Sequence, residues 1–133
     1  EAGRIAAEHI LSLGHSRIGF IFPPTDENDR ARGRLDAAMS TVKKSGAEIP
    51  EAWSVQSLYN ITQAKAVSRG LFNQCHPITA LICGNDIIAQ GAVAAALELG
   101  IRIPQDLSII GIGDFAGSAD MFPALSTVRI PAY

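Results

Sequence analysis

Two polar residues, Asn85 and Asp86, directly follow the short apolar run from Ala80 to Cys83, and an alanine-rich stretch continues from them to Gly100. This pattern predicts a buried strand that leads into a helix, with both polar side chains at the junction. In parallel α/β sheets, ligands bind outside the carboxyl ends of the strands. A carboxylate there can also cap the helix by accepting from free backbone N–H groups. We expect Asp86 to be the cap and Asn85 to contact a ligand.

Three arginines, Arg30, Arg32 and Arg34, lie near the start of another helical pattern. A guanidinium group can hold carboxylate and hydroxyl oxygens through two parallel donors. Arg30 and Arg34 share one helical face. The alternative is a solvated basic turn paired with nearby acidic residues, and we favour a site only for Arg34. Tyr59 follows a further predicted strand, where an aromatic ring can stack on a sugar or a base, although a tyrosine alone would be a surface residue.

Other chemical motifs are weak or missing. Residues 111–116 match the dinucleotide pattern G-x-G-x-x-A after a strand, but Pro123 leaves too little room for the long helix that this site needs. The three histidines are scattered, and the two cysteines lack metal-binding spacing. No nucleophile and base can be paired, so we expect neither an enzyme nor a metal or other cofactor.

The bulk composition is that of an ordinary globular domain. The 133 residues are 47% hydrophobic and 18% charged, with a formal net charge of −2. A nucleic-acid-binding face is normally basic, so this chain is not expected to bind nucleic acid by itself. No apolar run approaches the roughly 18 residues of a membrane span, and no membrane partner is expected. The chain begins with glutamate rather than methionine, and we expect a fragment or a processed product.

Predicted strands and helices alternate along the whole chain. The predicted strands are 18–22, 53–57, 80–83, 107–112 and 126–130, and the predicted helices are 3–13, 29–45, 61–75 and 86–99. Glycines 14, 46 and 100 follow helices and suit their closing turns. This order predicts an α/β fold, a parallel sheet flanked by helices on both faces, in one domain. Its ligand edge would carry the turns 23–34, 57–61, 84–86 and 113–117.

Several stretches resemble the LacI/GalR (lactose-repressor) family of bacterial transcription regulators. They are 7–21 (AEHILSLGHSRIGFI), 32–34 (RGR), 83–91 (CGNDIIAQG), 100–111 (GIRIPQDLSIIG) and 123–129 (PALSTVR). The resemblance implies a periplasmic-binding-protein-like, Rossmann-like effector-binding domain. Residues 1–133 would form mainly its C-terminal subdomain, and the DNA-binding headpiece would be absent from this chain.

The resemblance also implies effector contacts. The arginine after the first strand falls on Arg34, the stacking aromatic on Tyr59, the strand-end asparagine on Asn85, and a common polar contact on Arg30. Where the family usually has an aspartate this chain has Gly113, and the next residue, Asp114, is the candidate for that role. The local pattern looks like the gluconate-repressor branch, which suggests a sugar acid.

We therefore interpret the chain as the ligand-sensing domain of a cytoplasmic LacI-type repressor that responds to a sugar or sugar acid. Operator DNA would bind through the absent headpiece. The alternative is a sugar-binding protein of a transport system.

We also expect a homodimer, because the helix 86–99 carries no charged residue from Ile87 to Leu97. Its inner face does not account for Ala92, Ala94 and Ala96, which are small and would face outward toward a partner. The resemblance points to the same region. The candidate interface residues are Gln90, Ala94, Met121 and Phe122.

Overall fold

The computed structural model describes residues 2–26, 29–47, 49–58, 60–73, 78–103, 105–113 and 126–129. The helices are α1 (Ala2–Ser12), α2 (Asp29–Lys44), α3 (Ile61–Phe72) and α4 (Asp86–Glu98), with a short 3-10 helix η1 (Glu51–Trp53). The strands are β1 (Ile18–Phe22), β2 (Ser54–Gln56), β3 (Ala80–Cys83), β4 (Ser108–Gly113) and β5 (Ser126–Arg129).

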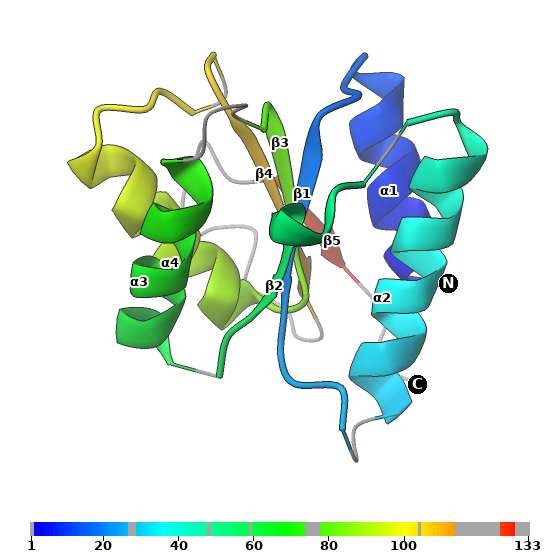
Figure 1. Ribbon diagram of the computed structural model, residues 1–133, viewed down its shortest axis with the longest axis horizontal. Coiled ribbons are helices and arrows are strands. Elements are labelled where there is room, and N and C mark those ends of the chain that lie inside the picture. The colour runs from blue at the N-terminus through cyan, green and yellow to red at the C-terminus, as the bar shows by residue number, and fades with distance from the viewer. Residues whose placement is uncertain are drawn as a thin grey trace.

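The strands form one parallel sheet in the order β2-β1-β3-β4-β5. Parallel neighbours cannot be joined by tight turns, so each connection crosses one face of the sheet. Helices α1 and α2 cover one face, and α3 and α4 cover the other (Figure 1). The predicted fold class, a parallel α/β sheet with helices on both faces, is confirmed.

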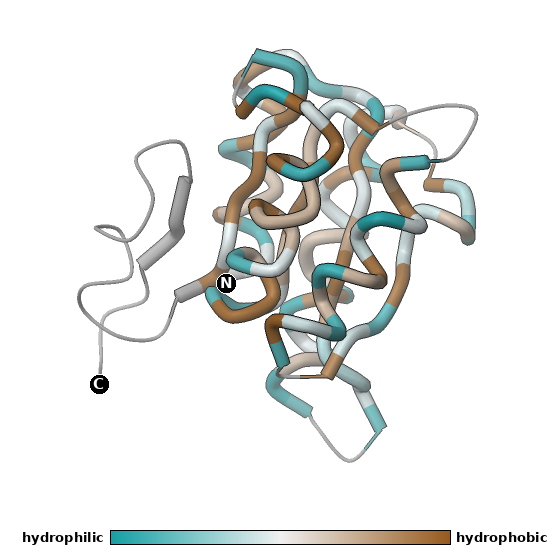
Figure 2. The backbone as a smooth tube through the Cα atoms, turned by 90° about the vertical axis from the view of Figure 1, so that its left-hand side faces the viewer, coloured by the Kyte–Doolittle hydropathy of each residue, from teal (hydrophilic) through white to brown (hydrophobic). Residues whose placement is uncertain are grey.

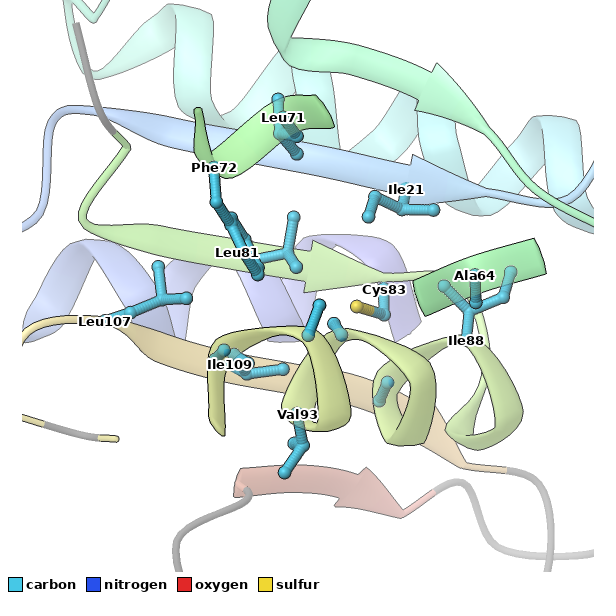
Figure 3. Close-up of a cluster of buried hydrophobic side chains, with 14 of the residues drawn as sticks. Ile21, Ala64, Leu71, Phe72, Leu81, Cys83, Ile88, Val93, Leu107 and Ile109 are labelled. Atoms are coloured by element: carbon cyan, nitrogen blue, oxygen red, sulfur yellow. The ribbon is translucent and has the colours of Figure 1, made fainter. Parts of the chain in front are cut away.

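Two hydrophobic clusters lie between these layers because successive strand residues point to opposite faces. Leu81 and Cys83 of β3 belong to the cluster under α3 and α4, whereas Ala80 and Ile82 belong to the cluster under α1 and α2. Figure 3 shows the first cluster, with Leu81, Cys83 and Ile109 directed toward the α3–α4 layer. Hydrophilic residues gather instead on the outer helical turns and loops (Figure 2).

The helix ends follow the predicted glycines. Gly14, Gly46 and Gly100 have φ values of 92°, 94° and 73°, a left-handed conformation that side chains other than glycine's rarely adopt. Several bounds differ from the prediction by one residue, and two differences are larger or change the element type. The helix predicted to reach residue 75 ends at Phe72, and Trp53 belongs to η1 rather than to β2.

The amino edge of the sheet, at the top of Figure 1, is held by a histidine from outside the strands. His15 lies 2.9 Å from the Thr79 hydroxyl through Nδ1 and 3.1 Å from the Ser108 hydroxyl through Nε2. Burial lowers the pKa of His15, which favours the neutral ring. This residue therefore links the segment before β1 to the starts of β3 and β4.

One buried polar group in α3 has no hydrogen-bond partner. Ser68 is fully buried, and its Oγ makes no hydrogen bond. We expect Ser68→Ala to stabilise the fold by about 1 kcal/mol, because it removes an unsatisfied buried hydroxyl and improves helix propensity. The melting temperature should rise by roughly 3 °C.

Calorimetric unfolding can test this expectation, with the exposed Ser40 of α2 as the matched helical serine. Ser40→Ala should change stability by only a few tenths of a kcal/mol, about the propensity difference alone. A destabilised Ser68→Ala variant would show that this hydroxyl contributes a favourable interaction.

Candidate functional site

The carboxyl ends of β1, β2 and β3 meet at the lower edge of the sheet in Figure 1, where α2 and α3 also begin. The Ser57 N–H donates to the Phe22 carbonyl at 3.0 Å, which joins the exit of β2 to that of β1. The Gly84 N–H donates to the Ile21 carbonyl at 2.9 Å, which joins the exit of β3 to β1. The chain segments that leave three strands are thus adjacent, as parallel topology requires of a ligand edge.

Two glycines allow this close approach. A Cβ atom at Gly84 would lie 2.8 Å from both the Phe22 ring and the Pro23 ring. A Cβ atom at Gly111 would lie 2.9 Å from Asp86 Oδ1. Such contacts are too short for any side chain, so these positions keep β3 tightly between its neighbours and bring the start of α4 onto β4.

Asn85, not Asp86, caps α4. Its Oδ1 accepts from the Ile88 N–H at 2.8 Å, and its carbonyl accepts from the Ala89 N–H at 3.1 Å. Its backbone is extended, with φ −158° and ψ 173°, which is the conformation of a cap residue. The prediction that Asp86 is the cap was therefore wrong by one residue. Asp86 is the first residue of the helix and is only 2% exposed.

The cap fixes the polarity of the Asn85 amide. Reversing the amide would place Nδ2–H against the Ile88 N–H, two donors facing each other, so the orientation is set by the helix. The Nδ2 group is shielded from water and has no hydrogen-bond partner. A buried donor left in this state costs about 1–3 kcal/mol. What Asn85 retains for any further contact is a pair of N–H donors.

The Cys83 thiol, two residues before Asn85, is not in a reactive form. Burial raises the pKa of the Cys83 thiol, and the nearby Asp86 carboxylate raises it further. The thiol is therefore protonated at neutral pH, whereas a reactive cysteine needs its thiolate form. Across the described ranges, no three His, Cys, Asp or Glu side chains are grouped to hold a metal ion.

The three arginines of α2 have different surroundings. Arg32 is exposed, and its Nη2 donates to the Thr25 carbonyl at 3.2 Å, so it supports the loop before the helix. Arg30 is also exposed, in the first turn, whereas Arg34 is half-buried in the second turn. The helix begins at the ligand edge, and Arg34 lies about 8 Å along it, from where a long side chain can reach back to that edge.

The remaining predicted site residues, Tyr59, Asp114, Met121 and Phe122, lie outside the described part of the chain. The residues on either side of position 59 are described. Asn60 caps α3 by accepting from the Gln63 N–H at 3.0 Å, and Gln63 Oε1 accepts from the Leu58 N–H at 2.6 Å. Leu58 and Asn60 are therefore both held by hydrogen bonds to the start of α3.

A separate cavity of about 290 Å³ lies at the amino edge, against Phe72, Ile78 and Leu107. The cavity lies at the amino edge of the sheet, whereas Asn85 lies at the carboxyl edge, so the cavity does not form part of the candidate site. The contacts of His15 at that edge were not predicted from the sequence, because Thr79 and Ser108 lie 64 and 93 residues after His15 in the chain.

We expect Asn85→Ala to destabilise the fold by about 1 kcal/mol through loss of the cap, whereas Asn85→Ser should be close to wild type because serine is also a good cap. Thermal unfolding can compare the two variants, and hydrogen exchange at the Ile88 amide reports the cap directly. Equal stability of Asn85→Ala and wild type would show that the Oδ1 contact contributes nothing.

The comparisons with known proteins agree on one family. A family model described as periplasmic binding protein-like domain matches residues 7–133. The HTH-type transcriptional repressor PurR of Klebsiella pneumoniae is 37% identical over 131 residues, which make up 98% of this chain and 38% of the repressor. The chain therefore spans about two-fifths of the length of this curated relative.

Solved structures give the same result. A LacI-family regulatory protein from Chloroflexus aggregans superimposes with a TM-score of 0.89 at 30% identity, over 98% of this chain and 47% of that one. A LacI-family transcriptional regulator from Mycobacterium smegmatis gives a TM-score of 0.88 at 35% identity, over 98% and 48%. The chain belongs to the periplasmic-binding-protein-like domain family, in the form found in LacI/GalR transcriptional regulators.

Proposed function

We propose that this chain is the effector-sensing part, mainly the C-terminal subdomain, of a LacI-type transcriptional repressor whose effector is a sugar or a sugar acid. The observation that carries the proposal is the Asn85 amide at the carboxyl edge, whose Oδ1 is fixed by the α4 cap and whose buried Nδ2 has no hydrogen-bond partner among the described residues. Sugar hydroxyl and carboxylate oxygens are suitable acceptors for such a group.

Helix starts and arginines at this edge support an anionic ligand, although the carboxylates of Asp29 and Asp86 also lie in the first turns of α2 and α4. Helices α2, α3 and α4 all begin there, and helix N-termini carry a partial positive charge. Arg34 and Arg30 add guanidinium groups in the first two turns of α2. We propose that Arg34 and Asn85 bind the effector directly, with Tyr59, Asp114 and Arg30 completing the contacts. A sugar acid would use both the hydroxyl and the charge chemistry of this set.

Regulation requires an effector that binds two states of the repressor with different affinities. We propose that operator DNA binds through a headpiece outside this chain, since the chain itself has a net charge of −2. Such a regulator works in the cytoplasm. Within the described residues, no helix has the length and apolar content to cross a bilayer.

A non-enzymatic role is also proposed. The Cys83 thiol is buried and protonated, and the Asn85 amide, which is held by the α4 cap, offers donors rather than a nucleophile. The reported relatives are regulators, which does not favour the alternative of a transport protein.

To test the sensing function, sugars and sugar acids are titrated into the intact protein by calorimetry. We expect at least one sugar acid to bind, and Arg34→Ala and Asn85→Ser to weaken its binding at least tenfold, about 1.4 kcal/mol. Because Asn85→Ser keeps the cap, its loss of affinity would report the amide donors alone. If no sugar or sugar acid binds, the proposed effector class is wrong.

We further propose that the regulator is a homodimer built on the outer face of α4. The alanines of this helix do not all face outward as predicted, because Ala92 and Ala96 are fully buried against the rest of the domain. The face that remains is formed by Ile87, Gln90, Ala94 and Leu97, and Leu97 is 67% exposed. A partly exposed, mostly apolar face without charge is typical of an interface. Met121 and Phe122 are proposed to extend it.

We expect Ala94→Glu to yield a folded monomer, because a buried carboxylate at a two-fold interface would face its own copy. Sedimentation velocity measures the mass, and circular dichroism checks the fold. Ala66→Glu, at an exposed alanine of α3, is the matched control and should remain dimeric. An Ala94→Glu variant that is still dimeric would place the interface elsewhere.

A further inference from the structure

Ile61, the first residue of α3, is exposed although it belongs to the inward-facing side of the helix. At 100° per residue it shares this side with Ala64, Ser68 and Phe72, all of which are buried. Ile61 itself is 46% exposed.

The turn that carries Ile61 is held firmly by hydrogen bonds. Ser57 is buried, and its hydroxyl donates to the Leu58 carbonyl at 2.9 Å. The Asn60 N–H donates to the same carbonyl at 2.7 Å, and the Ala64 N–H donates to the Asn60 carbonyl at 2.9 Å. Leu58, on this turn, is 53% exposed. Leu58 and Ile61 are therefore two large apolar side chains exposed at the ligand edge, beside hydrogen-bonded backbone.

Contacts between α3 and α4 place Ile61 near the start of α4. A Cβ atom at Gly91 would lie 2.5 Å from the Ala64 Cβ and 2.9 Å from the Ile61 carbonyl, so the two helices are in close contact there. Figure 3 shows Ala64 beside Ile88, the residue whose N–H is capped by Asn85. Ile61 lies one turn further toward the carboxyl edge than Ala64. The exposed isoleucine and the Asn85 amide therefore border the same corner of the site.

We propose that Ile61 is a specificity-determining residue that forms an apolar wall of the effector site, and that the effector is a cyclic sugar acid. This inference rests on the function proposed above. A pyranose ring presents a fixed apolar face of C–H groups together with its hydroxyl and carboxylate oxygens. An open-chain sugar acid has the same polar groups but must lose more conformational freedom to present such a face. Small-ligand sites combine apolar walls with a few fixed polar groups in this way.

The experiment compares D-glucuronate, a cyclic acid, with D-gluconate, an open-chain acid, by calorimetry on the intact protein. We expect wild type to bind glucuronate at least fivefold more tightly than gluconate. Ile61→Gln should weaken glucuronate binding five- to tenfold and gluconate binding less than twofold, which removes the preference. Ile61→Val, which retains most of the apolar surface, should show an intermediate loss and covers the case in which the glutamine variant does not fold.

Ile5→Gln is the matched control, because Ile5 is also a helical isoleucine and is 45% exposed. It should leave both affinities unchanged. A preference for gluconate, or unchanged binding of glucuronate to both Ile61 variants, would overturn the inference while the sensing function stands. Failure of every sugar and sugar acid to bind wild type would instead overturn the proposed function and this inference with it.

Discussion

Parallel pairing of β1, β3 and β4 forces every connection to cross a face of the sheet, so each following helix starts at the same edge. The free N–H groups of the first helical turns therefore accumulate there, and the sequence must satisfy them. It does so with asparagine caps, Asn60 on α3 and Asn85 on α4. The same constraint that builds the fold thus delivers oriented amide groups and partial positive charge to one place. The candidate site depends on this arrangement more than on any single side chain.

Glycine and alanine determine how closely the second layer can pack. Gly84 and Gly111 leave no space for a Cβ beside β1 and α4, and Gly91 leaves none beside α3. Ala89, Ala92 and Ala96 are fully buried in the same helix. Close packing of backbone against backbone is rigid because protein interiors leave little free volume. The helix pair α3–α4, which is also linked by ion pairs from Lys65 and Arg69 to Glu98, therefore holds the corner of the site in a fixed geometry.

The sequence was sufficient to predict most of the fold, because its apolar runs are short, α1, α2 and α3 are amphipathic, and Gly14, Gly46 and Gly100 mark helix ends. The prediction failed where a shift of one residue along the chain decides which side chain caps the helix or faces the core. Asn85 and Asp86 are both good caps, and only the backbone conformation shows that Asn85 has that role. Burial of Ala92 and Ala96 was also missed, since an almost uniformly apolar helix has no polar stripe to reveal its orientation. The contacts of His15 could not be predicted because they join three distant segments.

The double role of Asn85 restricts how this domain can change its ligand during evolution. Serine, threonine and aspartate can close the first turn of α4, but none of them supplies an N–H donor, and glutamine is one methylene longer than the cap allows. A substitution of Asn85 that changes the ligand preference therefore either destabilises the cap or removes the N–H donors. Exposed positions without a capping role, such as Leu58 and Ile61 after β2, can vary at little cost to the fold. We therefore expect the ligand preference to change first by substitutions at those positions, while Asn85 is retained.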